Sequence, residues 1–420
     1  MDYVPTSEKD TKDMLKQIGV NSIDDLIEEF KPPLRKKLNL TNPMSEMELV
    51  QHMASLAQKN VVLKYFVGGG SYDHYSPSVI NHLLLRGEFL TAYTPYQAEM
   101  SQGVLQAMYE FQSFICLLTG MDLANASLYD GASSLAEAAL LSSSYTKKNR
   151  VFVNDGLNPN YLDVLNTYCD VADLELTDKI DDKTACVIIQ NPDFFGNIEN
   201  FQNLSEKAHK EGALFITCVV EPTSLAIITP PRNFGADIVV GEGQPFGIPL
   251  SYGGPCLGFM AVKKFLLKKI PGRIVGMTTD SKGNEGFVLT FQAREQHIRR
   301  ERATSNITTN QALLALASTI YLATMGRSGL TNVAKTSYHR AHTLHEKLKG
   351  AGFEPLNKKP FYNEFLMKTP KSSEKILSGL LEKKILGGID LGDDRMLVCC
   401  TEKNSIQDIE LYEDVVREMK

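Results

Sequence analysis

Short apolar runs alternate with longer segments of mixed composition along the central part of the chain. The runs suit buried strands, and they lie at 126–129, 151–154, 186–190, 213–220, 236–240 and 256–262. Two of the segments between them, ASSLAEAALLSSSY and NLSEKAHKEG, have helical composition. Strands that alternate with helices predict a mostly parallel sheet covered by helices on both faces.

Longer helices flank this alternation. From Gln97 to Thr119, apolar residues recur at spacings of three and four, which predicts one helix that ends at Gly120. A second helical pattern covers 309–349. Beyond it, a smaller α/β unit is predicted from strand-like FEP, NEFLMK and RMLVCC, a helix near 373–384 and a C-terminal helix.

The first sixty residues consist of short helical patterns separated by prolines. SEKDTKDMLKQIG ends in Gly19, and SIDDLIEEF stops before Pro32 and Pro33. Ser45 is expected to cap the next helix, because Glu48 follows three residues later. We therefore expect three parts: an N-terminal helical arm at 1–60, a large domain at 61–328 and a small C-terminal α/β domain at 329–420.

The composition narrows the classes of protein to consider. A chain of 420 residues with 43% hydrophobic content can form a large domain plus a small one. The formal net charge of −6, from 44 basic and 50 acidic residues, indicates no basic surface for nucleic acid. The longest apolar stretch, at 312–326, is shorter than the ~20 residues that span a membrane, so it predicts a buried helix and no membrane partner.

The cysteines and the N-terminus indicate a compartment. Seven cysteines, an odd number, match neither a disulfide framework nor the CxxC spacing of a zinc site, so we expect no metal. The N-terminal stretch carries charges where a signal peptide has an apolar core. We therefore expect a protein of the reducing cytoplasm.

The stretch GEGQPFGIPLSYGGP, at 241–255, lacks a lysine that one fold would require. Pyridoxal-phosphate enzymes of the aspartate-aminotransferase fold place their imine-forming lysine after a strand such as ADIVV. Gln244 stands in this position, and no lysine occurs between Lys210 and Lys263. Because an amide cannot form a Schiff base, either the fold is different or the chemistry is located elsewhere.

Two other features match a site of this type. In LYDGASSLAEAA, residues Gly131, Ser133 and Ser134 would direct backbone N–H groups and hydroxyls at a phosphate, although ordinary strand-to-helix turns use similar residues. Glu221 ends a strand 23 residues before Gln244, in the general place where the pyridoxal fold keeps an acidic residue against the pyridine nitrogen. A solvated glutamate at a strand end produces the same pattern.

Aromatic residues gather just before the first long helix. Tyr93, Tyr96 and Glu99 lie there, and the tyrosines could line a pocket or pack in the interior. Upstream, the three consecutive glycines of FVGGGSYDHYSPSVI permit close backbone approach or a flexible turn.

Arginines gather in FQAREQHIRRERATSNI, at 291–307. Arg294 and Arg299 suit the binding of a carboxylate or a phosphate, because guanidinium groups bond to both through two nitrogens. A solvated helix face has the same composition, so the residues alone leave both interpretations open.

Longer motifs carry a resemblance to one family. These motifs are TAYTPYQAEMSQGVLQAMYEFQ, NASLYDGASSLAEAALL, VIIQNPDFFGNIE, GADIVVGEGQPFGIPLSYGGPCLGFMA, LTFQAREQHIRRERATSNITTNQALLALASTIYLATMG and FYNEF. They closely resemble the P proteins of the glycine cleavage system, in particular the N-terminal, or alpha, subunits of two-subunit glycine decarboxylases. The likeness extends from about residue 3 to the C-terminus without large gaps.

The resemblance implies a fold and a division of labour. The implied fold is pyridoxal-phosphate-dependent transferase fold type I, in which a separate beta subunit holds pyridoxal phosphate on its own lysine while Gln244 occupies that position here. The active site would lie between the two chains, in a heterotetramer of two alpha and two beta subunits. Glycine would lose CO2, and its aminomethyl group would pass to the lipoyl arm of the H protein.

The resemblance also implies roles for the clustered residues. Segments around the tyrosines line the shared cleft in the family, so we expect Tyr96 and one of Arg294 or Arg299 to orient the adduct of glycine and cofactor. We expect His297 and Arg302 to serve packing or the surface. Two alternatives are a non-catalytic scaffold for the beta subunit and an independent pyridoxal-phosphate enzyme that uses another lysine.

Overall fold

The first unit of the structure is a set of short helices. The structure is a computed structural model that describes residues 6–30, 40–303 and 305–419, and its contacts divide the chain into units at 1–61 and 62–420. The elements of the first unit are α1 (Glu8–Ile18), α2 (Ile23–Leu26), the 3-10 turn η1 (Glu28–Phe30) and α4 (Glu46–Ala57). Ser45 and Glu48 form the predicted capping box, and Gly19 ends α1 in the left-handed conformation. The helix end predicted before Pro32 lies outside the described residues.

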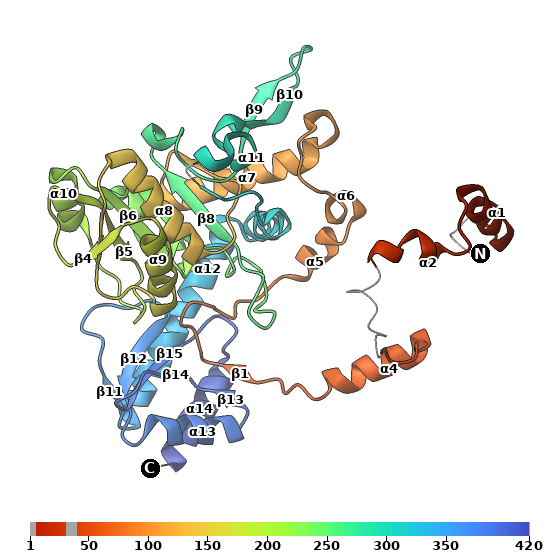
Figure 1. The fold of residues 1–420 in the computed structure, drawn as a ribbon. Helices are drawn as coiled ribbons and strands as arrows, with labels where there is room; N and C mark the ends of the chain where they lie inside the picture. The colour runs from red at the N-terminus through yellow and green to blue at the C-terminus, as the bar shows by residue number, and fades with distance from the viewer. Residues whose placement is uncertain (1–5, 31–39, 304, 420) are drawn as a thin grey trace. The chain divides into compact units, whose positions relative to one another are not determined.

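The second unit contains a sheet of seven strands in the order β2-β8-β7-β6-β5-β3-β4 (Figure 1). The strands are β2 (Leu123–Ala124), β3 (Arg150–Val153), β4 (Glu175–Thr177), β5 (Thr184–Gln190), β6 (Leu214–Val219), β7 (Ile238–Glu242) and β8 (Gly258–Val262). From β4 to β7 neighbouring strands are parallel, whereas β8 and β2 run antiparallel to their neighbours. The direction of β8 follows from the segment 243–257, which returns to the sheet without a helix.

The strand predicted at 126–129 is wrong. In this stretch only Leu128 forms a bridge, to Gly258, and the strand β2 lies earlier in the chain. The backbone N–H groups of Asn125 and Ala126 donate to two different segments, at Met260 and Arg273 respectively. Because consecutive residues bond to separate segments, no regular ladder forms here.

Helices cover both faces of this sheet, which explains the continuous apolar runs in its strands. One face packs against α8 (Gly131–Thr146) and α9 (Pro159–Val171), the gold helices of Figure 1. The other face packs against α7 (Gln102–Thr119), α10 (Gln202–Lys210) and α12 (Ala312–Gly350). In β5, Ile188 belongs to the first core and Ile189 to the second.

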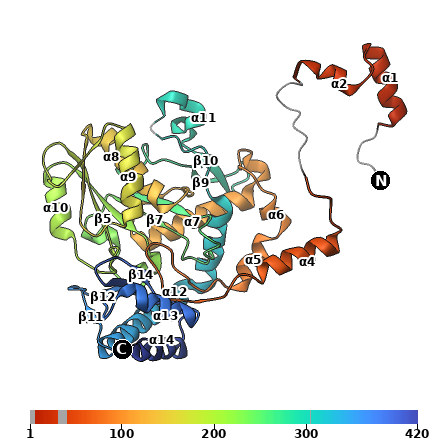
Figure 2. The same ribbon diagram turned by 60° about the horizontal axis from the view of Figure 1, so that its bottom comes forward.

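A smaller antiparallel sheet lies in the C-terminal part, with α13 and α14 packed together beside it (Figure 2). Its elements are β11 (Glu354–Pro355), β12 (Glu364–Lys368), β14 (Ile389–Asp390), β15 (Arg395–Cys399), α13 (Ser373–Glu382) and α14 (Ile406–Glu418). The helix α12 leads to it and is kinked at Gly326, where φ is 58°. The domain boundary predicted at 328 falls within α12 and stays a prediction.

The remaining elements connect or extend these sheets. They are β1 (Lys64–Tyr65), β13 (Ile385–Leu386), α5 (Ser78–Leu84), α6 (Gly87–Leu90), β9 (Ile274–Thr279), β10 (Glu285–Thr290) and α11 (Gln296–Arg299). The strands β1 and β13 pair in parallel, and β9 and β10 form an antiparallel hairpin. Short 3-10 turns lie at Ala98–Met100, Pro222–Ala226, Pro231–Phe234, Lys264–Leu266, Gln292–Arg294 and Arg300–Arg302.

Candidate functional site

The carboxyl ends of β6 and β7 form one edge of the central sheet, where open α/β sheets bind their ligands. Glu221 follows β6, and Gln244 follows β7. The N-terminus of α8 lies at the same edge, because the Gly131 N–H donates to Glu242. The structure therefore brings together the residues that were predicted from the sequence to form a cofactor site.

Gln244 is buried and bonded entirely to the chain's own backbone. Its Nε2 donates to the carbonyl oxygens of Tyr72, at 3.0 Å, and Ile248, at 2.7 Å. Its Oε1 accepts the Tyr72 N–H at 3.1 Å. Both amide hydrogens are engaged, so Gln244 holds the segment around Tyr72 in place.

Glu221 faces a buried histidine. The Nε2 of His74 lies 2.9 Å from Glu221 Oε2, and its Nδ1 lies 2.6 Å from Glu402 Oε2. Burial alone lowers the pKa of His74, but the two carboxylates outweigh it and raise this pKa to about 10. His74 is therefore an imidazolium at neutral pH, and it donates to both carboxylates.

The carboxylate of Glu242 lies against the first turn of α8. It accepts hydrogen bonds from the N–H groups of Gly131 at 3.0 Å, Gln244 at 3.0 Å and Leu257 at 2.7 Å. Burial raises the pKa of Glu242 to about 7, although these N–H groups act in the opposite direction. A side chain of the same molecule thus occupies the anion position of this helix.

The serines predicted to bind phosphate bond within their own turn. The hydroxyls of Ser133 and Ser134 donate to the carbonyl oxygen of Asp130, at 3.2 and 2.6 Å. The Asp130 carboxylate caps α8 by accepting the Ser133 N–H at 2.6 Å. These contacts are the ones that any capped helix start makes.

The glycine-rich segment before His74 is held by Glu364 of β12. This carboxylate accepts the Gly69 N–H at 2.7 Å and the Tyr72 hydroxyl at 3.0 Å. Burial raises the pKa of Glu364 to about 8. The segment therefore contacts Glu364 of the smaller sheet and Gln244 beside the larger one, as the close backbone approach permitted by its glycines predicts.

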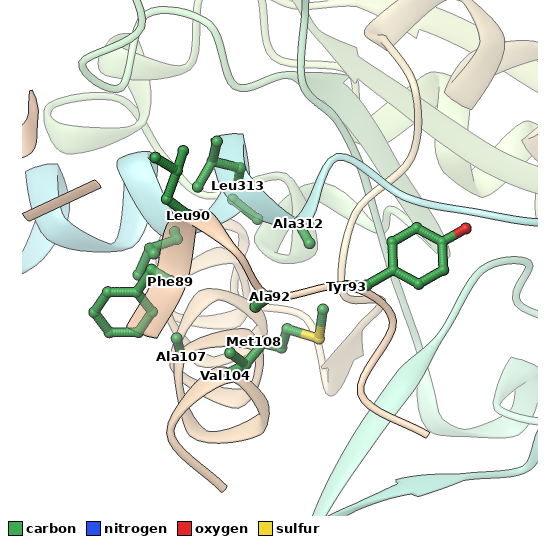
Figure 3. Close-up of a pocket in the computed structure, with 11 residues that line it drawn as sticks. Phe89, Leu90, Ala92, Tyr93, Val104, Ala107, Met108, Ala312 and Leu313 are labelled. Atoms are coloured by element: carbon green, nitrogen blue, oxygen red, sulfur yellow. The ribbon is translucent and has the colours of Figure 1, made fainter. Parts of the chain in front are cut away.

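The predicted tyrosines and Glu99 lie in the irregular segment before α7. Tyr93 is 84% exposed and lies at one side of an apolar pocket of about 120 Å³ between α6, α7 and the start of α12 (Figure 3). Tyr96 is 55% exposed, and its ring lies edge-on to His297 with centroids 5.9 Å apart. Glu99 is exposed. These side chains are accessible from solvent in this chain.

The two predicted arginines lie in different surroundings. Arg294 is mostly buried, and its terminal nitrogens donate to the carbonyl oxygens of Ile270 and, at 2.6 Å, Gly272. Burial lowers the pKa of Arg294 to about 10. Arg299, in α11, is exposed, as is Arg302 beside Glu301. Arg294 therefore supports the turn before β9, whereas Arg299 is free to meet solutes.

Sequence reasoning missed a buried arginine beside Tyr96. The Arg273 guanidinium lies 5.8 Å from the Tyr96 ring centroid and donates to Asn310 Oδ1 at 2.6 Å. Asn310 in turn donates to the Ser127 hydroxyl at 2.9 Å. This network connects Tyr96 to the segment that leads into α8. A single arginine among apolar residues was the only available signal.

Charged residues within buried strands were a second missed signal. Glu242, in IVVGE, and Glu364, in EFLMK, each lie in a strand whose neighbouring residues are largely buried. Lone charges in such runs are costly unless bonded, so they indicate specific partners. Both residues have them: Glu242 at the sheet edge described above, and Glu364, in β12 of the smaller sheet, at the glycine-rich segment.

A sequence model of the family described as Glycine cleavage system P-protein matches residues 1–415. The chain belongs to this family. The P-protein resemblance noted from the sequence motifs is therefore confirmed.

Relatives correspond to this P-protein chain over its whole length. It is 47% identical over 442 residues to the probable glycine dehydrogenase (decarboxylating) subunit 1 of Carboxydothermus hydrogenoformans, with 99% of each chain covered. A crystal structure of glycine decarboxylase (P-protein) of the glycine cleavage system, in inhibitor-bound form, is 40% identical and covers 100% of both chains with a TM-score of 0.93.

The fold is that of pyridoxal-phosphate-dependent enzymes of fold type I, as the resemblance implied. The glutamate decarboxylase of Lactobacillus brevis shares it at 11% identity, with a TM-score of 0.69 over 91% of this chain and 94% of that one. At such low identity the likeness concerns the fold alone.

The residues at the sheet edge of this P-protein chain do not fit a bound pyridoxal phosphate. Gln244 offers no amine for an imine. The carboxylate of Glu221 is already bonded to His74, and the first N–H of α8 is already bonded to Glu242. The acidic group and the first helix N–H that would hold the coenzyme are thus engaged within the chain.

Within residues 6–30, 40–303 and 305–419, no helix has the length and apolar character needed to cross a membrane. The same residues contain no group of three or more histidine, cysteine, aspartate or glutamate side chains placed to hold a metal ion. All seven cysteines are unpaired.

Proposed function

We propose that this chain is the alpha-type subunit of a glycine decarboxylase. It works with a beta subunit that carries pyridoxal phosphate, and together they decarboxylate glycine and transfer its aminomethyl group to the lipoyl arm of the H protein. The observation that carries the proposal is Gln244, whose amide is bonded to backbone groups where this fold needs a lysine. The full-length match to relatives named subunit 1 supports it.

The chain lends positioning groups to its partner's active site. Tyr96 suits this role, because its ring is half exposed while Arg273 and His297 restrain it. Arg299 is the better candidate for direct contact with the glycine carboxylate, since Arg294 already donates to two backbone carbonyls. Tyr93 and Glu99 are further candidates on the same exposed segment.

The contribution of such groups is electrostatic and geometric. A guanidinium that holds the carboxylate of glycine fixes the orientation of the bond to be broken, and a second chain closing over the site excludes water. Neither task requires a lysine on the contributing chain. This division of labour fits an internal site that does not fit the coenzyme.

The expected assembly follows from the same proposal. A relative designated subunit 1 implies a companion subunit, and we infer a heterotetramer of two alpha and two beta subunits that receives the H protein. The seven unpaired cysteines suit the reducing cytoplasm.

Reconstitution tests the proposal. The chain is purified alone and together with the beta subunit, and exchange of the glycine carboxyl carbon with labelled bicarbonate is measured with lipoylated H protein. We expect exchange only in the mixture, with the coenzyme's imine absorbance on the beta subunit. Exchange and imine absorbance in this chain alone would instead establish an independent pyridoxal-phosphate enzyme.

A second arm separates a catalytic contribution from a scaffold. Tyr96→Phe and Arg299→Ala are compared with Arg302→Ala, an exposed arginine of the same segment. Full exchange activity in assembled complexes of the first two variants would identify the chain as a scaffold.

A further inference from the structure

The sheet edge beside α8 has the parts of a site for a phosphorylated heteroaromatic coenzyme. Glu221, at the end of β6, supplies a carboxylate of the kind that faces a pyridinium nitrogen. The N-terminus of α8 supplies backbone N–H groups of the kind that bind phosphate. In this chain, both positions are taken by residues of the chain itself.

The position opposite Glu221 holds the ring of His74. An imidazolium is flat, aromatic and cationic, and its Nε2–H donates to Glu221 at 2.9 Å as a pyridinium N–H would. Its second nitrogen donates to Glu402, which follows β15 of the smaller sheet. The ring therefore joins the two sheets of the unit.

The position at the start of α8 holds the carboxylate of Glu242. Three backbone N–H groups, from Gly131, Gln244 and Leu257, donate to its two oxygens. Of these three N–H groups, only that of Gly131 belongs to α8; together they converge on the carboxylate as N–H groups converge on a phosphate at a helix N-terminus. Glu242 is buried, and its carboxylate already takes the hydrogen bonds of these three N–H groups.

The segment leading to His74 is shaped to pass through this site. A Cβ on Gly68 would lie 2.4 Å from Glu364 Oε1, and a Cβ on Gly70 would lie 2.7 Å from Asn158 Nδ2. A side chain at either position would therefore require these neighbours to shift, and the φ of 118° at Gly70 also favours glycine. Gln244 then fixes the next turn through the backbone of Tyr72.

We propose that residues 68–75 and Glu242 form a built-in occupant of the coenzyme-type site, which prevents this chain from binding pyridoxal phosphate or free phosphate and joins its two sheets instead. The inference goes beyond the proposed function and does not rest on it, because it concerns the chain without any partner. Its tests use binding and stability, so their failure is distinguishable from failure of the exchange assay.

The wild-type chain provides the first test. Pyridoxamine phosphate is the probe, because it lacks the aldehyde that reacts with surface lysines. Equilibrium dialysis is expected to show no binding at one site per chain, and inorganic phosphate is expected to leave the thermal unfolding midpoint where chloride of equal ionic strength leaves it. Stoichiometric binding of pyridoxamine phosphate, or a rise of the midpoint with phosphate, would overturn the proposal.

Removal of the internal anion provides the second test. Glu242→Ala is expected to unfold at a lower temperature and to regain about 2 °C or more with phosphate well above its Kd, because the N–H groups then accept the added anion. The control is Glu137→Ala, which removes a different buried carboxylate, on α8, that faces Ser305. Equal responses of the two variants to phosphate contradict the proposal.

Removal of the internal ring provides the third test. His74→Gly is expected to be stabilised by added imidazole, which refills the space between Glu221 and Glu402, by a similar shift of the midpoint. The control is His209→Gly, whose partner Asp237 lies elsewhere in the sheet. An imidazole response confined to the control, or shared equally by both variants, contradicts the proposal. If a variant does not fold, the wild-type binding measurement still decides.

Discussion

Replacing His74 by glutamine removes a buried cation from between two carboxylates. The glutamine amide can donate a hydrogen bond to one of them but carries no charge. Glu221, which is buried, and Glu402, which is partly buried, then lose the imidazolium that they share in the wild-type chain. The variant therefore tests how much of the stability depends on this charge.

The structure sets the size and the pH range of the effect. The pKa of His74 rises from 6.5 to about 10, and at ~1.4 kcal/mol per unit this corresponds to at most about 5 kcal/mol. Breaking a buried ion pair typically costs about 3–5 kcal/mol, which agrees. Because the folded-state pKa is raised, the stabilisation is complete below the unfolded pKa of 6.5 and is lost as the pH rises through about 10.

Urea unfolding of the wild-type chain and the variant at several pH values measures the contribution of the His74 charge to the free energy of unfolding. We expect the variant to be less stable by about 3–5 kcal/mol near pH 6, and the difference to shrink steadily towards pH 10. The matched control is His82→Gln, because His82 is exposed on α5. NMR of the His74 ring is expected to show an imidazolium at pH 8.

If the difference in the free energy of unfolding between wild type and His74→Gln stays constant from pH 6 to pH 10, the reasoning is refuted. A neutral ring at pH 8 would also refute it, since the carboxylates would then not control its protonation. A control as unstable as the variant would show that the effect is not specific to the buried ring.

Three further outcomes are expected. Tyr96→Phe and Arg299→Ala are expected to lower the rate of exchange by the assembled complex by a factor of about 10²–10³, whereas Arg302→Ala has little effect, because only groups in the water-poor site orient the reactants. Exchange assays check this expectation, and size-exclusion shows that the complexes are assembled. Rates near the wild-type value in assembled complexes would contradict it. Gln244→Lys without the beta subunit creates neither exchange nor an imine, because the site is filled; an imine trapped by borohydride at this lysine would contradict that expectation. Glu364→Gln is expected to gain stability relative to wild type as the pH rises from 4.5 to about 8, because the raised pKa of Glu364 means that folding favours its protonated form. Above that pH the difference in the free energy of unfolding is expected to stay constant. Urea unfolding in which this difference does not change between pH 4.5 and 8 would disprove the expectation.

Local patterns located most elements of the fold. Runs of buried residues marked β3 and β5 to β8, and the three-and-four spacing marked α7, because burial imposes a period on each element. The prediction failed at 126–129, where backbone groups bond to two separate segments. The direction of β8 also escaped prediction, since direction depends on the connection from β7 rather than on the strand's own residues.

Some properties of the candidate residues could be predicted from the sequence, and others could not. Residue types and position nominated Glu221, Gln244 and the start of α8, and these do lie together. The exposure of Arg299 and the burial of Arg294 were not predictable, because both lie in one run of similar composition. Which arginine is accessible depends on how the turn at 270–272 packs against that run.

The sequence by itself determined the family, the βαβ alternation and the absence of a lysine at position 244, because each is a property of local residue order. Only the tertiary structure decided what occupies the site. His74 meets Glu221 across 147 positions of the chain and Glu402 across 328. Contacts between such distant residues impose no period and no spacing on the sequence. They arise when packing of the two sheets brings the charged side chains together. Because these side chains are removed from water, each charge is then stabilised only by its charged neighbours.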